Sequence, residues 1–194
     1  KLTHDLSHFL DSRAKIQKIS LTQTIQKQEA VEAVRQYLIA AKVKPRIANL
    51  IANAVDELLM NALFDAPCDE FGRPLYSSTE RTAERDLKDT ELVSMSIGFD
   101  GFNIGISVTD HFGNLDRNSL LSHVTESYRK KDYHIKTGVA GAGLGVATIF
   151  SSGGSLVYHC ESKVKTEATL LYRTYSTYRE FKHQFKFFSA KFYL

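Results

Sequence analysis

The chain has 194 residues, of which 43% are hydrophobic and 24% are charged, so it can bury a core without disulfides or a structural metal. Its 25 Lys and Arg residues nearly balance its 22 Asp and Glu residues, which argues against a nucleic-acid partner. Short apolar runs and the lack of a signal-peptide pattern predict a cytoplasmic protein with no membrane span. Cys68 and Cys160 fit neither a zinc site nor a redox pair, and we expect free thiols. Because the first residue is Lys1 rather than Met, we expect a fragment or a trimmed chain.

The first part of the chain predicts one strand followed by two helices. Residues 14–24 partly alternate between apolar and polar side chains, whereas residues 28–43 have helical spacing. Pro45 ends that helix and starts the next one. In the second helix, which ends at Pro67, apolar residues recur every three or four positions: Ile47, Leu50, Ile51, Ala54, Val55, Leu58, Leu59, Ala62 and Leu63.

A polar segment and a hairpin follow the second helix. Residues 68–90 are polar and of mixed charge, so we expect a long surface excursion. Residues 92–99 and 102–109 are two strand-like runs. They are joined at Asp100-Gly101, a dipeptide that favours a tight hairpin.

The remaining elements set the fold class. Residues 116–140 are polar and predict a loop, and a glycine cluster at 138–145 precedes a short helix over 146–151. Residues 155–161 and 168–173 predict a second pair of strands. This order lacks the strand-helix alternation of a doubly wound sheet. It predicts an α+β fold, a two-layer sandwich with helices on one face of a mixed, mainly antiparallel sheet.

Both ends of the chain predict additional helical elements. Residues 1–14 predict an N-terminal helical extension in which His4 and His8 lie one turn apart, as two metal ligands would. A partly solvated helix is the alternative. Residues 174–194 predict an aromatic helix that packs on the domain or serves in docking or homodimerisation, with a membrane-surface role as another alternative. Its aromatic residues at helical spacing are Phe181, Phe185, Phe188 and Phe192.

Three short motifs carry the candidate chemistry. Glu57 and Asn61 share one border of the apolar stripe, where an amide oxygen could bind Mg²⁺ and a carboxylate could act as a base. A helix whose polar edge happens to carry Glu and Asn is the alternative. Asp110 follows a strand and precedes Gly113, an arrangement that is also typical of a turn. The glycines of the run 141–145 precede a helix, where backbone N–H groups can approach phosphate closely, with a flexible or tight connection as the alternative.

The polar segment 116–140 is predicted to be a lid over bound phosphate. It has little apolar periodicity, and glycines on both sides can act as hinges. The basic run that includes Lys130 would neutralise phosphate charge, with an exposed loop face as the alternative.

Together and in this order, the motifs resemble those of the GHKL ATPase superfamily, which includes gyrase-type, heat-shock chaperone, histidine kinase and mismatch-repair ATPases. AVDELLMNALFDA resembles the asparagine box of that family, ISVTDHFGNL its first glycine box, and GVAGAGLGVA its second. The resemblance spans residues 15–173. It implies an ATP-binding domain of the Bergerat type that uses ATP and Mg²⁺.

The resemblance also implies a role for each motif residue. Glu57 would be the general base or the water-orienting carboxylate, and Asn61 would bind Mg²⁺. Asp110 would accept a hydrogen bond from the adenine amino group, and Gly113 would let the base approach. The other nucleotide-binding residues would be Asp65, Lys130, Gly141, Gly143, Leu144, Gly145 and Thr166. The chain departs from the family pattern at Asn114, where a second glycine is usual.

Within the superfamily, the compact layout is most similar to the anti-sigma factor serine kinases of bacteria. This similarity implies a Mg²⁺-dependent protein serine/threonine kinase in bacterial signalling, with a protein partner such as an anti-sigma antagonist. Two alternatives stay open: a non-catalytic, nucleotide-dependent switch, and the ATP-binding half of a histidine kinase without its phosphoacceptor helices. Glu57 favours the enzyme, and the short stretch before Asn61 leaves no room for a phosphoacceptor hairpin.

Overall fold

A computed structural model describes residues 5–76, 78–129, 148–149, 152–175 and 177–193. Six strands form one sheet in the order β1-β2-β3-β5-β4-β6. All neighbouring strands are antiparallel except β4 and β6, which are parallel. The strands are β1 (Lys15–Leu21), β2 (Val93–Phe99), β3 (Asn103–Asp110), β4 (Ser155–Glu161), β5 (Lys165–Arg173) and β6 (Phe188–Tyr193).

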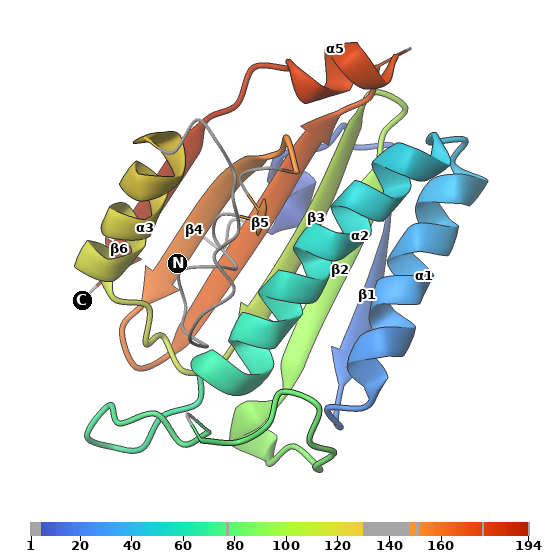
Figure 1. The fold of residues 1–194 in the computed structure, drawn as a ribbon. Helices are drawn as coiled ribbons and strands as arrows, with labels where there is room; N and C mark the ends of the chain where they lie inside the picture. Colours follow the sequence, from blue (N-terminus) through green and yellow to red (C-terminus); the bar gives the residue numbers. More distant parts are fainter. Residues whose placement is uncertain (1–4, 77, 130–147, 150–151, 176, 194) are drawn as a thin grey trace.

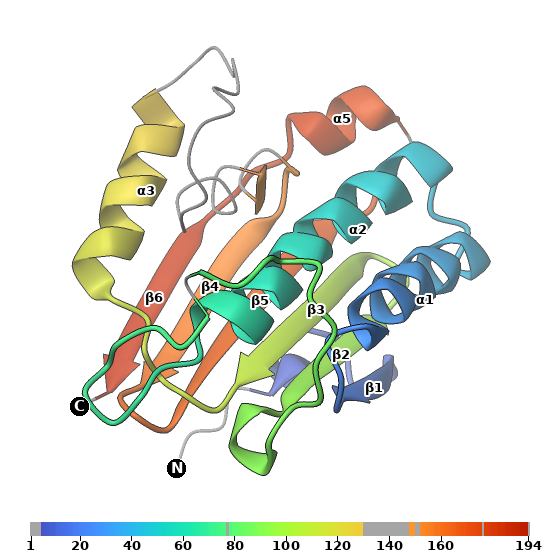
Figure 2. The same cartoon turned by 60° about the horizontal axis from the view of Figure 1, so that its bottom comes forward.

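The helices cover one face of this sheet, as Figures 1 and 2 show. They are α1 (Gln26–Ala40), α2 (Pro45–Met60), α3 (Arg117–Arg129) and α5 (Tyr178–Lys182). A π-helical turn, Asn61–Asp65, continues α2, and 3₁₀ turns are formed by Leu6–His8 and Asp89–Glu91. The predicted α+β class, with helices on one face of a mixed, mainly antiparallel sheet, is confirmed.

Helix α2 is the central element of the core. Pro45 occupies its first turn, where a missing N–H costs nothing. Nine of its 16 residues are buried, since the apolar stripe read from the sequence packs on the sheet. With the π turn it is long and apolar enough to cross a membrane, but 67% of its most apolar window is buried in the fold, as expected of a core helix.

The strands of the predicted hairpin are tightly packed on both faces. Ile97 and Ile106 are opposite each other and buried on the helix side. On the other face Gly98 is paired with Gly105, and a Cβ atom at either position would lie 2.6 Å from a leucine methyl carbon of the N-terminal segment. These glycines therefore allow Leu6 and Leu10 to pack directly on the sheet.

The two ends of the chain differ from the predicted helices. Between residues 5 and 14 the structure contains a 3₁₀ turn, and His4 lies outside the described residues. The prediction of a single aromatic helix over the tail is wrong, because Phe181 is buried in α5, whereas Phe188 and Phe192 belong to β6. The spacing misled because Phe188 and Phe192 are also an even number of residues apart, so both side chains fit one face of a strand.

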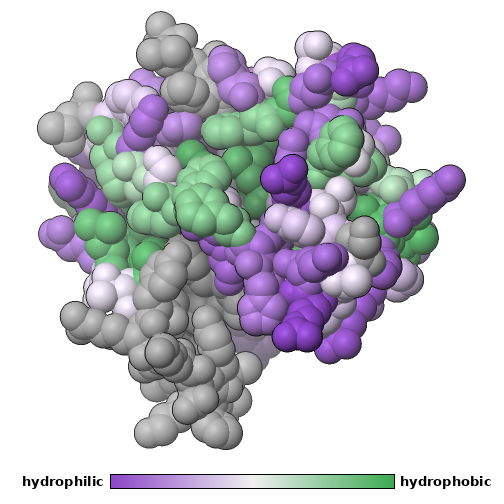
Figure 3. Space-filling model, turned by 90° about the horizontal axis from the view of Figure 1, so that it is seen from above, coloured by the Kyte–Doolittle hydropathy of each residue, from purple (hydrophilic) through white to green (hydrophobic). Residues whose placement is uncertain are grey.

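The apolar side chains of the tail are only partly buried. Figure 3 looks onto the end of the molecule that carries α5 and shows a broad apolar area beside a more polar one. Phe102 of the β2–β3 hairpin and Phe185 and Phe187 of the α5–β6 connection are exposed.

The predicted loop over 116–140 is also corrected, because residues 117–129 form helix α3. Few apolar residues mark this helix, but Leu120 and Val124 are four positions apart and both buried. Arg129 of the predicted basic run ends α3, whereas Lys130, Lys131 and the rest of residues 130–140 lie outside the described residues. Of the predicted helix 146–151, residues 148–149 are described, and both are helical.

Candidate functional site

A cavity of about 220 Å³ lies between the C-terminal end of α2, the sheet and α3. The sheet contributes the end of β3 and the neighbouring part of β5. Side chains such as Leu58, Val108, Leu120 and Tyr158 form its apolar walls. Its polar walls are formed by Asn61, Asp65, Asp110, Asn114, Asp116, Ser119, His123 and Thr166.

The π turn places two of these polar residues on the cavity wall. The N–H of Ala66 donates to the carbonyl of Asn61 over 2.8 Å, five residues back instead of four. Pro67 has no N–H to offer the carbonyl of Leu63, which an α-helix would require. Arg85 supplies the donor instead, with Nη2 2.5 Å from that carbonyl oxygen. The widened turn is therefore stabilised by a side chain from the following loop.

Asn61 has an unusual polar environment. Its Oδ1 atom is buried and has no hydrogen-bond donor within the described part of the chain. Buried acceptors are nearly always paired in folded proteins, so an unpaired one beside a cavity is a candidate ligand atom. Amide oxygen is a ligand type that Mg²⁺ accepts, usually alongside water and phosphate oxygens.

Glu57 lies one helical turn before Asn61 and is partly buried, but it does not line the cavity. Burial raises the pKa of its carboxyl group, and the neighbouring Asp56 raises it further. Arg81 and Lys27 act in the opposite direction. A carboxylate with a raised pKa beside a cavity is suited to accept a proton.

Asp110 ends β3 and is 6% exposed. Burial raises the pKa of its carboxyl group to about 6, against hydrogen bonds from the backbone N–H groups of Phe112, Gly113 and Thr166. The Phe112 N–H donates to Oδ1 over 2.9 Å. The carboxyl group is thus held in a fixed position by the backbone. Its ionisation costs free energy unless a further hydrogen-bond donor is present.

Gly113 has a structural reason to be glycine. Its φ is +59°, and a Cβ atom would lie 2.0 Å from the carbonyl oxygen of Glu161 and 2.8 Å from the backbone nitrogen of Lys163. In this structure the residue is therefore required by the β4–β5 turn. Thr166 is opposite Asp110 in the β3–β5 ladder and is buried, so the turn and the cavity share one end of the sheet.

The structure thus brings together four of the predicted site residues at one cavity: Asn61, Asp65, Asp110 and Thr166. Lys130, Gly141, Gly143, Leu144 and Gly145 lie outside the described residues. Cys68 and Cys160 are free thiols, as expected. Among the described residues, no cluster of three or more His, Cys, Asp and Glu side chains could hold a metal.

Sequence reasoning missed two arginines from the polar segment after α2. Arg81 Nη2 donates to both carboxylate oxygens of Asp65, over 3.1 and 3.2 Å. Arg85 Nη1 donates to the buried Glu91 over 2.5 Å, and the guanidinium lies 3.8 Å from the ring centroid of Tyr76. No periodicity marks either residue, because a loop side chain can reach a site from any position.

No protein-family model matches the sequence. No curated protein matches it either. Among solved structures, the chain is similar to one described as the crystal structure of the SiaB–SiaC complex from Pseudomonas aeruginosa. The two are 17% identical, the similarity covers 79% of this chain and 88% of that chain, and the TM-score is 0.41. The function is therefore inferred from the geometry of the cavity.

Proposed function

We propose that the cavity binds ATP together with Mg²⁺, and that the protein is an ATP-dependent serine/threonine protein kinase of bacterial signalling. One observation carries the proposal: Asn61, Asp110 and Thr166, from three separate parts of the sequence, line one cavity. The unpaired Oδ1 of Asn61 fits a Mg²⁺ ligand, and the buried carboxylate of Asp110 fits an N–H donor of a nucleobase.

The walls of the cavity suit a flat heteroaromatic ring. Val108 and Tyr158 are buried and line the same cavity as Asp110. A volume of about 220 Å³ lies below the roughly 300–1,000 Å³ typical of sites that enclose a whole ligand. We therefore assign the cavity to the adenine base and place the phosphates toward its opening.

The exocyclic amino group of adenine would donate a hydrogen bond to the Asp110 carboxylate. That bond favours the ionised form, so it offsets the cost of a buried charge. An analogue that lacks this amino group would leave Asp110 with a poorly paired buried carboxylate.

At the phosphate end, Asn61 would hold the cation through Oδ1. Bound Mg²⁺ would neutralise phosphate charge during transfer. Glu57, one turn away, would accept the proton of a serine or threonine hydroxyl from a protein partner. A new bond would form between that oxygen and the γ-phosphorus while the γ-phosphorus separates from the β–γ bridging oxygen. The products would be a phosphorylated partner and ADP.

The first experiment measures nucleotide binding by isothermal titration calorimetry with and without Mg²⁺. We expect ATP binding that depends on Mg²⁺, and we expect Asp110→Asn to weaken it by about 1–3 kcal/mol because the adenine donor loses its charged acceptor. Asp56→Asn is the matched control, since Asp56 pairs with Lys27 and does not line the cavity. Absence of ATP binding by the wild type would overturn the proposal.

The second experiment separates binding from chemistry. Glu57→Gln keeps the shape of the side chain but removes the base, so turnover should fall about 10²-fold or more while ATP affinity is kept. Phosphate release from ATP is the readout, and Glu29→Gln is the control, since Glu29 is exposed on α1 and does not line the cavity. ATP binding without hydrolysis or phosphoryl transfer would instead support a nucleotide-dependent switch.

A further inference from the structure

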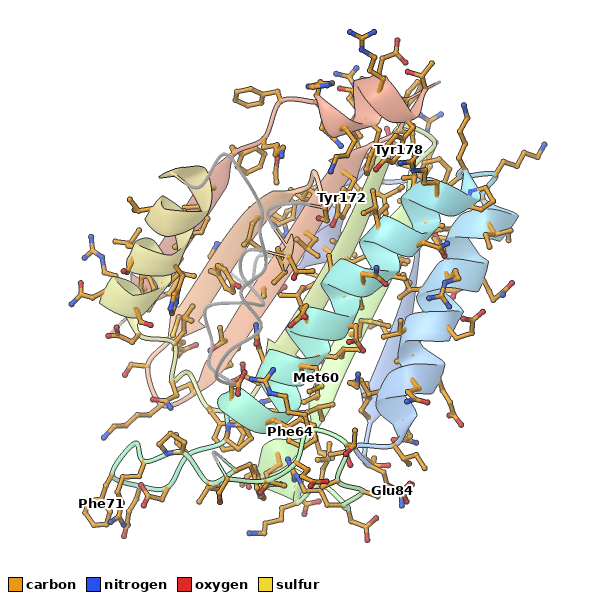
Figure 4. The ribbon with its side chains drawn as sticks, viewed as in Figure 1. Met60, Phe64, Phe71, Glu84, Tyr172 and Tyr178 are labelled. Atoms are coloured by element: carbon orange, nitrogen blue, oxygen red, sulfur yellow. The ribbon has the colours of Figure 1, made fainter. Side chains whose placement is uncertain are left out.

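The loop after the π turn contributes charge as well as structure. It brings Arg81 and Arg85 to the C-terminal end of α2. Figure 4 shows Phe71 at the outer tip of this loop and Glu84 below the end of the helix. The segment that holds the arginines therefore returns to the site after an excursion into solvent.

The described walls of the cavity are poorly matched to a polyphosphate. Besides Asp110, which the proposed function assigns to the adenine base, Asp65 and Asp116 line the cavity, whereas none of the described lining residues is a lysine or an arginine. Carboxylates repel phosphate groups, and the repulsion is strong where water is partly excluded. Besides the Mg²⁺ that Asn61 would hold, a ligand that carries several negative charges needs a cationic side chain close to this wall.

Arg81 is the described arginine bound directly to a carboxylate of that wall. Its Nη2 atom makes both hydrogen bonds to Asp65. Its Nε and Nη1 atoms make no hydrogen bond to any described residue. The side chains of Arg81 and Asp65 are 33% and 31% exposed, so the pair is accessible from the solvent. One side of the guanidinium is thus anchored while further N–H donors stay available.

The neighbouring arginines are placed differently. Arg85 is held by Glu91 and the Leu63 carbonyl through its two terminal nitrogens, and it does not line the cavity. Arg73 pairs with Asp69 within the loop and is 74% exposed. Among these three residues, Arg81 alone pairs with a carboxylate of the cavity wall.

We propose that Arg81 binds the phosphate groups of the nucleotide, with Asp65 holding its guanidinium at the cavity wall. The inference rests on the proposed function, because it assumes that the cavity takes a nucleotide. A guanidinium suits this task, since its planar set of N–H donors can bind a carboxylate and a phosphate oxygen at the same time. Its positive charge also acts on Glu57, whose pKa it lowers.

The test compares adenosine, ADP and ATP with Mg²⁺, by calorimetry on the full chain. Arg81→Gln should weaken ATP binding at least about tenfold and ADP binding less, because charged hydrogen bonds to phosphate are lost. Adenosine binding should change by less than about twofold, since it has no phosphate. Arg81→Lys should recover part of the ATP affinity because it keeps the charge.

Arg73→Gln is the matched control: it removes an arginine from the same loop and breaks a similar ion pair away from the cavity. It should leave all three affinities unchanged. Equal weakening of adenosine and ATP by Arg81→Gln would overturn the inference, because Arg81 would then only shape the loop. Unchanged ATP binding in Arg81→Gln would overturn it too, while the proposed function would stand. A wild type that binds adenosine but not ATP, or neither, would overturn the proposed function itself.

Discussion

The two ends of helix α2 lie in contrasting surroundings. At its N-terminal end, Ile47 and Ile51 are buried and the Arg46 guanidinium lies 3.8 Å from the ring centroid of Tyr178 in α5. At its C-terminal end, the helix widens into a π turn, Asn61 carries an unpaired buried oxygen, and Asp65 depends on a loop for its partner.

This difference separates the end of the helix that stabilises the fold from the end that lines the proposed nucleotide site. Apolar side chains at the first end gain free energy by leaving water, at about 25 cal/mol per Å². Polar groups at the other end cost free energy unless partners are supplied. Tyr178 at the first end and Phe64 of the π turn at the other are both visible in Figure 4. The polar end persists because the following loop supplies Arg81 and Arg85.

The strongest test of this comparison is the loss of Arg85. Arg85→Met should lower the free energy of unfolding by about 3–5 kcal/mol, because Glu91, 2% exposed, would keep a buried charge without its main partner. The Leu63 carbonyl would also lose its donor. Urea unfolding measures the change. Lys88→Ala is the control, since this 76% exposed lysine lies 3.9 Å from Glu91 and should cost less than about 1 kcal/mol. A loss of under about 1 kcal/mol for Arg85→Met would mean that the π turn needs no support from the loop.

The opposite end is tested by a core truncation. Ile51→Ala should lower the free energy of unfolding by about 2–5 kcal/mol, since it removes fully buried methyl groups and leaves a cavity. Nucleotide affinity of the folded protein should be unchanged, because the two ends are structurally separate. Asn53→Ala, an exposed position on the same helix, is the control and should change stability by about 0.5 kcal/mol or less. A parallel loss of affinity in Ile51→Ala would contradict the separation.

Asp110 provides a test in which a substitution is expected to raise the free energy of unfolding instead of lowering it. Because its pKa in the folded protein, about 6, is above its ordinary value of 3.8, the folded state holds the proton more strongly. The stability that it contributes is present below about pH 4 and is lost as the pH rises through 6. Asp110→Asn should therefore stabilise the ligand-free protein by about 1–3 kcal/mol at pH 8 and by much less at pH 4. Thermal unfolding at the two pH values measures this; a variant that is equally destabilised at both would show that the carboxylate is a structural group.

The smallest effect is expected for an exposed side chain of the tail, which lies beside the N-terminal end of α2. Phe185 is 86% exposed, so Phe185→Asp should change the free energy of unfolding by about 0.5 kcal/mol or less. Phe181 is fully buried and stacks on Tyr172, so Phe181→Ala should cost about 3–5 kcal/mol. Urea unfolding of both variants is the measurement. If Phe185→Asp costs several kcal/mol, its side chain is buried in solution by another surface.

Much of the helix-sheet framework was predictable because it rests on local patterns. The apolar spacing of the second helix, Pro45 at its start and the Asp100-Gly101 hairpin each constrain the neighbouring backbone directly. The same reasoning failed at α3 and in the tail. Helix α3 has few apolar residues to mark its helical period. The phenylalanines of the tail have a spacing that fits both a helix and a strand.

The sequence by itself predicted the elements from β1 to β3, the strands β4 and β5, and the three short motifs that carry the candidate chemistry. Only the tertiary structure decided that Asn61, Asp65, Asp110 and Thr166 line one cavity, because their distance in space is set by strand pairing. It also decided that the loop after α2 returns two arginines to that end of the helix. Loop side chains carry no periodic signal, and an ion pair such as Arg81 with Asp65 forms only after the sheet, the helix and the loop have packed together.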